Sequence, residues 1–235
     1  MFLTPQQIRE FGDQLSRLPS RELGGETIEK ILASVLPQAK QLPKDKKWFD
    51  IVQPSRGLEV KTFVVDPPLE AGRTIYNVLK RISKIESKDE GARLRAPQVV
   101  GDEIIDYLQG SIREHATLKR IPAERVMAIL FRVTEATRFA YWEEPLDFGR
   151  KQDYRWTWNE AETLKGYRGT DEIFQWYSRN QKQFMYRWKV PTTADFIDVT
   201  PVATITLTEE ELEERIERSY REGYEDAKTG KSKRL

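Results

Sequence analysis

The stretch from residue 48 to residue 65 constrains the fold more than any other part of this 235-residue chain. It holds two runs rich in β-branched and aromatic residues, separated by Gln-Pro-Ser-Arg-Gly at 53–57. Pro54 presets φ for the first turn position, and Gly57 can adopt a positive φ at no steric cost. The pattern predicts an antiparallel β-hairpin.

Three charged residues lie within this predicted hairpin. Because side chains alternate along a strand, Glu59 and Lys61 share one face. Leu58 and Val60 take the other face, and Asp50 on the partner strand is expected to meet Glu59 or Lys61, depending on the register. Two carboxylates beside an ammonium suit Mg²⁺ chemistry on a phosphodiester. The alternative is a half-exposed strand whose Glu and Lys are simply solvated.

The order of a helix, an Asp-bearing strand, a short turn and a strand carrying Glu-Val-Lys resembles the catalytic core of the PD-(D/E)XK nucleases. That superfamily contains most type II restriction endonucleases. The resemblance covers about residues 24–65 and implies that Asp50 and Glu59 are metal ligands, while Lys61 orients or activates the water. Phe49 stands where the family pattern has Pro, but that Pro is not a ligand.

A helix is expected before the hairpin, because apolar residues recur at helical spacing after Gly24-Gly25 and Pro37 ends the pattern. In the resembled family this helix often contributes an acidic metal ligand. Glu26, at the start of the helix, is the candidate for that role. A Glu there also favours the helix dipole without any function.

The remaining periodicity predicts further helices and a buried strand. Thr4-Pro5-Gln6-Gln7 opens a helix as a capping box, and helical spacing extends over residues 74–85 and 99–118. Residues 125–133 are apolar on both faces, as in a central strand, and residues 139–142 are its expected neighbour. The expected fold class is α/β in the α+β sense, with a central mixed β-sheet flanked by helices, as in restriction endonucleases.

Two basic regions are candidates for DNA contact. The connection at 73–95 would contact phosphates, unless it is only a solvated helix end and loop. Aromatic and basic residues are interleaved over 154–188, where the polar run at 178–183 carries side chains that read base edges and most of the rings are expected to form core. The candidate DNA-binding residues are Arg81, Lys84, Arg93, Arg95, Arg179, Asn180, Gln181, Lys182 and Gln183.

The composition is that of a globular protein, with 38% apolar and 33% charged residues and a net charge of +1. A single domain is expected, with a catalytic core at 24–133, a recognition region at 150–207, and a C-terminal helix with a basic tail at 208–235. The absence of cysteine excludes disulfides and thiolate metal sites. No membrane-spanning run or signal peptide is found, so a cytoplasmic location is expected. The single histidine, His115, is expected to be structural.

These features predict a sequence-specific, Mg²⁺-dependent endonuclease of double-stranded DNA, a type II restriction enzyme in which Mn²⁺ can replace Mg²⁺. One alternative is a structure-specific or repair nuclease of the same fold, which would need no base-reading segment. Another is a non-catalytic DNA-binding protein in which the triplet is incidental. The narrow apolar stripe of the last predicted helix would pack on its own domain or pair with a second copy in a homodimer.

Overall fold

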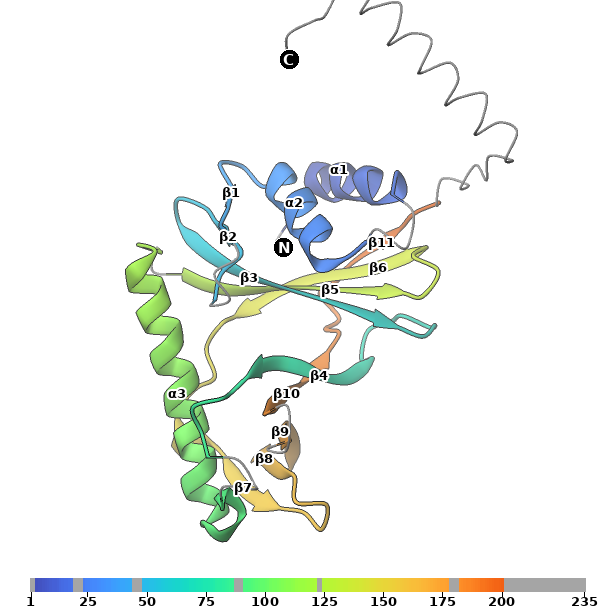
Figure 1. The fold of residues 1–235 in the computed structure, drawn as a ribbon. Helices are drawn as coiled ribbons and strands as arrows, with labels where there is room; N and C mark the ends of the chain where they lie inside the picture. The colour runs from blue at the N-terminus through green and yellow to red at the C-terminus, as the bar shows by residue number, and fades with distance from the viewer. Residues whose placement is uncertain are drawn as a thin grey trace, which may run out of the picture. The chain divides into compact units, whose positions relative to one another are not determined.

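Two β-sheets lie at the centre of the described chain and contribute to a common hydrophobic core (Figure 1). The computed structural model describes residues 3–18, 23–43, 48–86, 91–121, 124–177 and 182–200. Met1–Pro201 form one compact unit. The end of the recognition region expected at 150–207, the final helix and the basic tail lie outside the described residues, as do positions 178–181 of the polar run.

Sheet A contains the predicted hairpin. Its six strands, in spatial order, are β1 (Lys40–Gln41), β2 (Ile51–Val52), β3 (Arg56–Val65), β5 (Glu124–Val133), β6 (Arg138–Pro145) and β11 (Asp195–Asp198). The hairpin is confirmed, because Ile51 lies opposite Leu58 in an antiparallel pair. β3 and β5 run parallel while the other neighbours are antiparallel, so the expected mixed sheet is confirmed as well.

Helices cover sheet A on one face and contribute to the core on the other. α1 (Pro5–Ser16) begins with the expected capping box at Thr4, and α2 (Gly25–Val35) ends before Pro37. Both pack on the face of sheet A that carries Leu58 and other apolar residues. α3 (Pro97–Leu118) contributes to the core on the opposite face. None of the described helices combines the length and the apolar character that crossing a membrane requires.

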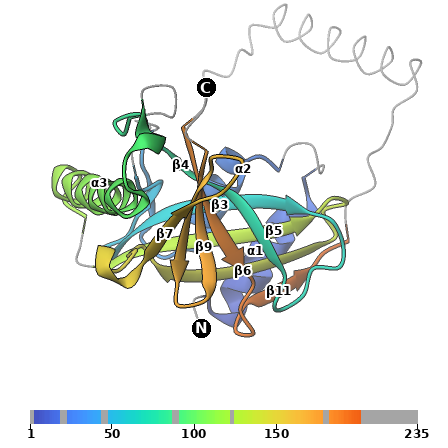
Figure 2. The same ribbon diagram turned by 90° about the horizontal axis from the view of Figure 1, so that it is seen from below.

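Sheet B is entirely antiparallel and lies against the second face of sheet A. Its strands, in spatial order, are β4 (Thr74–Arg81), β10 (Gln183–Lys189), β9 (Asp171–Tyr177), β8 (Leu164–Arg168) and β7 (Arg155–Trp158). Figure 2 shows these strands running across those of sheet A. Two short 3₁₀ helices, η2 (Ala92–Leu94) and η3 (Lys151–Asp153), lie in the connections.

The helix predicted over 74–85 is wrong, since residues 74–81 form β4. β4 pairs with β10 along its length, and a bulge between Phe184 and Met185 shifts the register. The bulge and the end of the strand leave Leu79 and Ile82 buried three residues apart, which imitates helical spacing. The β-branched and aromatic residues of this segment instead suit a strand that pairs with another part of the chain.

Aromatic side chains dominate the core between the sheets, as expected for the rings of the C-terminal half. Phe174, Trp176, Phe184 and Trp188 are completely buried. The Phe63 ring on β3 packs at a tilt against the Trp188 ring on β10, with centroids 5.1 Å apart, which connects the two sheets. The hydrophobic core therefore fixes β4 and β10 relative to the strand that carries the Glu-Val-Lys triplet.

Candidate active site

Where β2 ends, the Asp50 side chain replaces it as the hydrogen-bond partner of the β3 backbone. β2 pairs with β3 only at two positions, so the edge of β3 beyond Leu58 lacks a strand partner there. The Asp50 backbone N–H donates to the Leu58 carbonyl oxygen at 2.8 Å. The Asp50 Oδ2 atom then accepts the Val60 N–H at 2.7 Å. The carboxylate of Asp50 is therefore held against the strand that carries Glu59 and Lys61.

Glu59 and Lys61 lie on the same face of β3, as the alternation predicts. Glu59 is only 5% exposed, and its Oε1 atom lies 2.6 Å from the Lys61 Nζ atom. Its Oε2 atom accepts the Phe49 backbone N–H at 3.1 Å. The site thus places two carboxylates and one ammonium together in a largely buried setting.

Electrostatics couple these groups. Burial and the neighbouring charge of Glu59 raise the pKa of Asp50 to about 7, although the Val60 hydrogen bond opposes that rise. Burial alone would lower the pKa of Lys61, but the charge and hydrogen bond of Glu59, together with the charges of Asp50 and Glu29, outweigh burial and raise it. Lys61 is therefore a cation at neutral pH, and Asp50 titrates near neutrality.

A third carboxylate acts on the site from α2. Glu29 is 8% exposed, and its charge contributes to raising the pKa values of both Asp50 and Lys61. Its Oε2 atom accepts the Gln41 side-chain amide at 3.3 Å. Glu26, the candidate from the sequence, has a side chain 54% exposed, with its Oε1 atom 3.2 Å from Lys30 Nζ. Glu29 could have been found in the sequence as a charge within the apolar stripe of its helix.

The residue before Asp50 uses its backbone in a way that proline could not. Phe49 has φ 62°, whereas the proline ring fixes φ near −65°. Its N–H also makes the hydrogen bond to Glu59, which a proline would lack. The departure from the family pattern at this position is therefore required by the local geometry.

The donor set fits a hard cation that keeps some of its water. In the part of the chain that the structure describes, no three Asp, Glu, His or Cys side chains are grouped closely enough to hold a metal ion by themselves. Mg²⁺ commonly binds through one or two carboxylates and completes its octahedron with waters and substrate phosphate. Asp50 and Glu59 supply oxygen donors of that kind beside Lys61.

Another buried carboxylate of sheet A has a structural explanation. Glu143 on β6 is 5% exposed, with one oxygen bound by Arg56 and the other 2.5 Å from the Tyr141 hydroxyl group. Arg56 is held in turn by Gln53 at 2.8 Å. This network compensates the charge of Glu143 with a guanidinium and a phenol, whereas Asp50 has other carboxylates around it.

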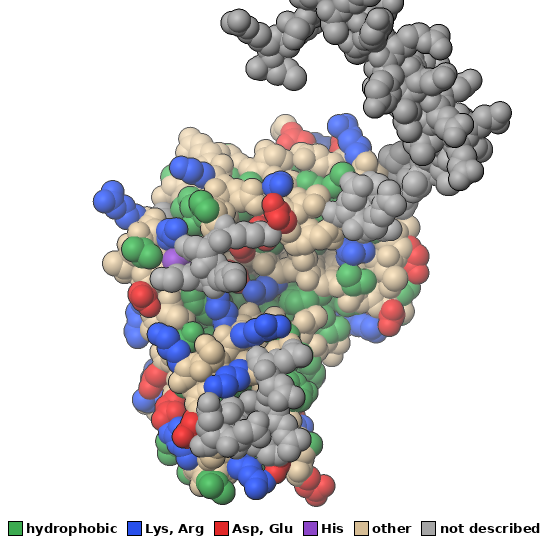
Figure 3. All heavy atoms as spheres, viewed as in Figure 1, with side chains coloured by type: hydrophobic (Ala, Val, Ile, Leu, Met, Phe, Trp, Pro, Cys, Tyr) green, Lys and Arg blue, Asp and Glu red, His purple; other side chains and the backbone are tan. Residues whose placement is uncertain are grey.

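A hollow of about 430 Å³ borders the segment that leads to Asp50. It is lined by Trp48, Lys80, Lys84, Tyr107, Gly110, Ser111 and Glu114. The Lys80 Nζ atom lies 4.3 Å from the centre of the Trp48 ring. Figure 3 shows Lys and Arg side chains gathered across the middle of this face, which gives it a positive character suited to phosphates.

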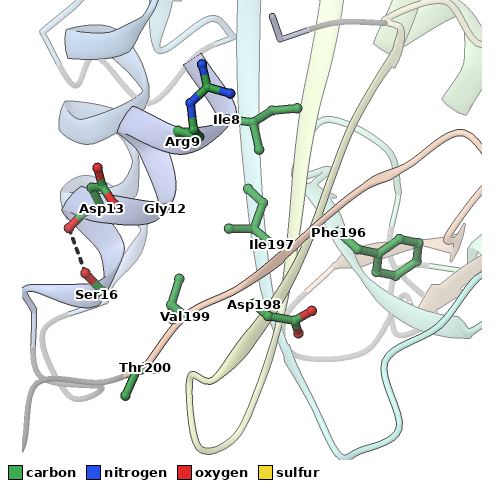
Figure 4. Close-up of a pocket in the computed structure, with 10 residues that line it drawn as sticks. All are labelled: Ile8, Arg9, Gly12, Asp13, Ser16, Phe196, Ile197, Asp198, Val199 and Thr200. Carbon is green, nitrogen blue, oxygen red and sulfur yellow. Dashed lines mark hydrogen bonds between the residues drawn. The ribbon is translucent and has the colours of Figure 1, made fainter. Parts of the chain in front are cut away.

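A second hollow of about 430 Å³ lies between α1 and β11 (Figure 4). Gly12 allows this close approach, because a Cβ atom there would lie 3.0 Å from the Ile197 side chain. Figure 4 shows Asp198 pointing away from α1, and this carboxylate pairs with Arg138 at 3.0 Å. The charged groups around this hollow do not converge, so it offers no comparable site.

The structure brings the two predicted DNA-binding regions together, because Arg81 of β4 lies opposite Gln183 of β10. Lys182 lies beside them, with its Nζ atom 3.3 Å from the Ser83 carbonyl oxygen. Lys84 is exposed and lines the hollow beside Trp48.

The other candidates in the basic connection already have acidic partners. Arg93 pairs with Glu162, and Arg95 with Glu103. These two arginines would have to exchange a carboxylate for a phosphate. Arg179, Asn180 and Gln181 lie outside the described residues.

Comparison of the chain with protein-family models, with curated proteins and with solved structures finds no match.

Proposed function

We propose that this protein is a Mg²⁺-dependent endonuclease that hydrolyses phosphodiester bonds of double-stranded DNA at specific sequences, as type II restriction enzymes do. The observation that carries the proposal is the convergence of Asp50, Glu59 and Lys61 at one edge of β3. The resemblance to the PD-(D/E)XK core supports it, because α2, the Asp50 segment, the turn and the strand with the triplet follow in the order that the resemblance requires.

Each residue of the group has a distinct role in this proposal. Asp50 and Glu59 would hold Mg²⁺, which polarises the phosphoryl oxygens and makes bound water more acidic. Lys61 is protonated, so it orients the attacking water or neutralises a phosphate oxygen rather than removing a proton. Phe49 fixes Glu59 through its backbone N–H, and Glu29 adds negative charge that favours cation binding.

The surface around the site supports a nucleic acid substrate. Lys80 and Lys84 line the hollow beside Trp48, two residues before Asp50, where they would contact phosphates flanking the cleaved bond. Base reading is assigned in this proposal to the run at 178–183, which follows β9 and leads into β10. The proposal includes a cytoplasmic location, and it keeps both alternatives for the last predicted helix, which would pack on its own domain or pair with a second copy in a homodimer.

Cleavage of plasmid and phage DNA by the whole protein tests the proposal. Discrete fragments are expected with Mg²⁺ or Mn²⁺, and none with Ca²⁺ or excess chelator. Asp50→Asn, Glu59→Gln and Lys61→Met should each reduce the rate by about 100-fold or more, because each removes a group that acts on the transition state. Glu70→Gln, a change in an exposed carboxylate after β3, serves as the matched control and should cleave normally.

The pattern of products separates the alternatives. Cleavage restricted to branched or damaged DNA would instead support the alternative of a structure-specific or repair nuclease. Tight DNA binding without metal-dependent cleavage would assign the protein to the non-catalytic class. Full activity in excess chelator, or normal rates for all three variants, would overturn the proposed site.

A further inference from the structure

The outer face of sheet B has an unusual surface composition. Along β9 the side chains of Phe174 and Trp176 enter the core, so those of Gln175 and Tyr177 project from the opposite face. Tyr76 of β4 lies on the same outer face, and Tyr76 and Tyr177 are 36% and 43% exposed. Aromatic rings are therefore presented to solvent on the outer face of an antiparallel sheet.

Hydrogen bonds fix these rings against the sheet. The Tyr76 hydroxyl group donates to the Glu172 carbonyl oxygen at 3.0 Å, although β10 lies between β4 and β9. Neighbouring strands lie about 4.8 Å apart, so the ring of Tyr76 must extend across β10. The Tyr177 hydroxyl group is 2.6 Å from Gln175 Oε1, and that of Tyr167 is 3.3 Å from Glu172 Oε2. Rings held by their hydroxyl groups present their faces with little loss of conformational entropy.

Cationic side chains are interleaved with the rings. The Arg155 guanidinium lies 4.5 Å from the centre of the Tyr167 ring. Lys165 pairs with Glu172 at 2.8 Å, and the Glu172 carboxylate also accepts hydrogen bonds from Tyr167 and Gln175. Arg187 lies opposite Tyr76, with its guanidinium 3.7 Å from an exposed carboxylate at the start of β9. The face therefore combines aromatic surfaces with three cations, of which Lys165 and Arg187 would exchange a carboxylate for a phosphate on binding.

We propose that this face binds single-stranded nucleic acid. Unpaired bases would stack on Tyr76, Tyr167 and Tyr177, and the phosphates would lie near Arg155, Lys165 and Arg187. A duplex hides the faces of its bases within the stack, so exposed rings on the face of a sheet favour an unpaired strand. The inference concerns binding without cleavage and does not depend on the proposed activity.

Fluorescence anisotropy with a labelled 20-nucleotide oligothymidine, in chelator and at two salt concentrations, tests the inference. Tyr76→Ala and Tyr177→Ala should each weaken binding roughly tenfold, because stacking contributes strongly for each base. Tyr76→Phe and Tyr177→Phe should retain most of the affinity, since the ring remains. Arg155→Ala and Arg187→Ala should weaken binding and reduce its salt dependence.

Two controls make the result specific. Leu118→Ala removes an exposed apolar side chain from α3, and Arg9→Ala removes an exposed charge from α1; both should bind normally. Thermal melting confirms that each variant is folded. The inference is overturned if the oligonucleotide does not bind, or if the variant that carries both Tyr76→Ala and Tyr177→Ala binds it as well as the unmodified protein. It is also overturned if these changes weaken binding of a DNA duplex but not of the oligonucleotide. Because Asp50→Asn should bind the oligonucleotide normally, failure of cleavage and failure of this inference are distinguishable.

Discussion

The His115 Nδ1 atom accepts a hydrogen bond from the Trp48 backbone N–H at 2.9 Å, which joins α3 to the segment that carries Asp50 across 67 residues of sequence. The His115 side chain is completely buried, and its ring stacks on Phe49 with centroids 5.7 Å apart. The Trp48 indole N–H donates to the Ser111 hydroxyl group at 2.9 Å, one turn earlier on α3. Through these contacts α3 positions the Asp50 segment.

Replacing His115 should therefore affect both stability and cleavage. His115→Leu leaves the Trp48 N–H without its acceptor, which should cost about 1 to 3 kcal/mol in the free energy of unfolding. His115→Asn can place its amide oxygen near the position of Nδ1 and should recover part of that loss. Urea denaturation and cleavage rates would measure both effects, and equal stability of the Leu and Asn variants would contradict the role of the hydrogen bond.

Introducing the proline of the family pattern at position 49 should be harmful here. Phe49→Pro cannot adopt φ 62° and removes the N–H that binds Glu59, so we expect loss of cleavage and about 3 kcal/mol of destabilisation. Phe49→Gly keeps the backbone geometry and the N–H, losing only the ring. It should retain more activity than the Pro variant in assays at saturating Mg²⁺. An active, stable Pro variant would show that this segment rearranges.

Asp50 makes stability depend on pH. Its pKa is raised to about 7, so ionising it opposes folding; this penalty is absent below about pH 4 and complete above pH 7. In chelator, Asp50→Asn should therefore match the unmodified protein near pH 4 and be more stable by about 2 to 4 kcal/mol at pH 8. Added Mg²⁺ should reduce that difference by stabilising the ionised form. Thermal melting across pH measures it, and a constant difference at all pH values would contradict the linkage.

The two acidic residues of α2 should behave differently. Glu29→Gln removes a charge that raises the pKa of Asp50, so the pH midpoint of cleavage should move down and the Mg²⁺ requirement should rise by about tenfold. Glu26→Gln removes only an exposed charge paired with Lys30 and should leave both unchanged. Cleavage measured against Mg²⁺ concentration at several pH values separates them. The reverse result would support the assignment of Glu26 as the ligand.

Two glycines of α3 offer a matched test of how the helix packs on sheet B. A Cβ atom at Gly101 would lie 2.2 Å from the Trp156 ring, while one at Gly110 would meet no atom within 4 Å. Gly101→Ala should cost about 3 kcal/mol through overpacking. Gly110→Ala should gain about 0.5 to 1 kcal/mol, because alanine favours the helix. Equal stability of the two variants in urea would mean that α3 shifts freely on the sheet.

Local sequence determined that a hairpin forms and that the charged side chains of its second strand lie on one face. Pro54 lies in the turn as expected, and the two-residue period of a strand places Glu59 and Lys61 on one face. The expected turn role of Gly57 is wrong, because Gly57 already pairs with Val52 within β3 and does not adopt a positive φ; its missing side chain instead admits Phe49 and Ile121. The capping box at Thr4 likewise identified the first helix from neighbours in the chain. These features are readable because the interactions that produce them span only a few residues.

Tertiary structure alone decided the features that depend on distant partners. Residues 74–81 became a strand because β10, about 100 residues later, supplies its hydrogen bonds, and a bulge there imitates helical spacing. The sequence marks Glu29 as a charge within the apolar stripe of its helix, but only the packing of α2 on β3 brings that charge close enough to act on Asp50. His115 reaches Trp48 only after α3 has packed on the core. Burial and pairing between remote segments set these relationships, so they follow from the folded chain and not from its periodicity.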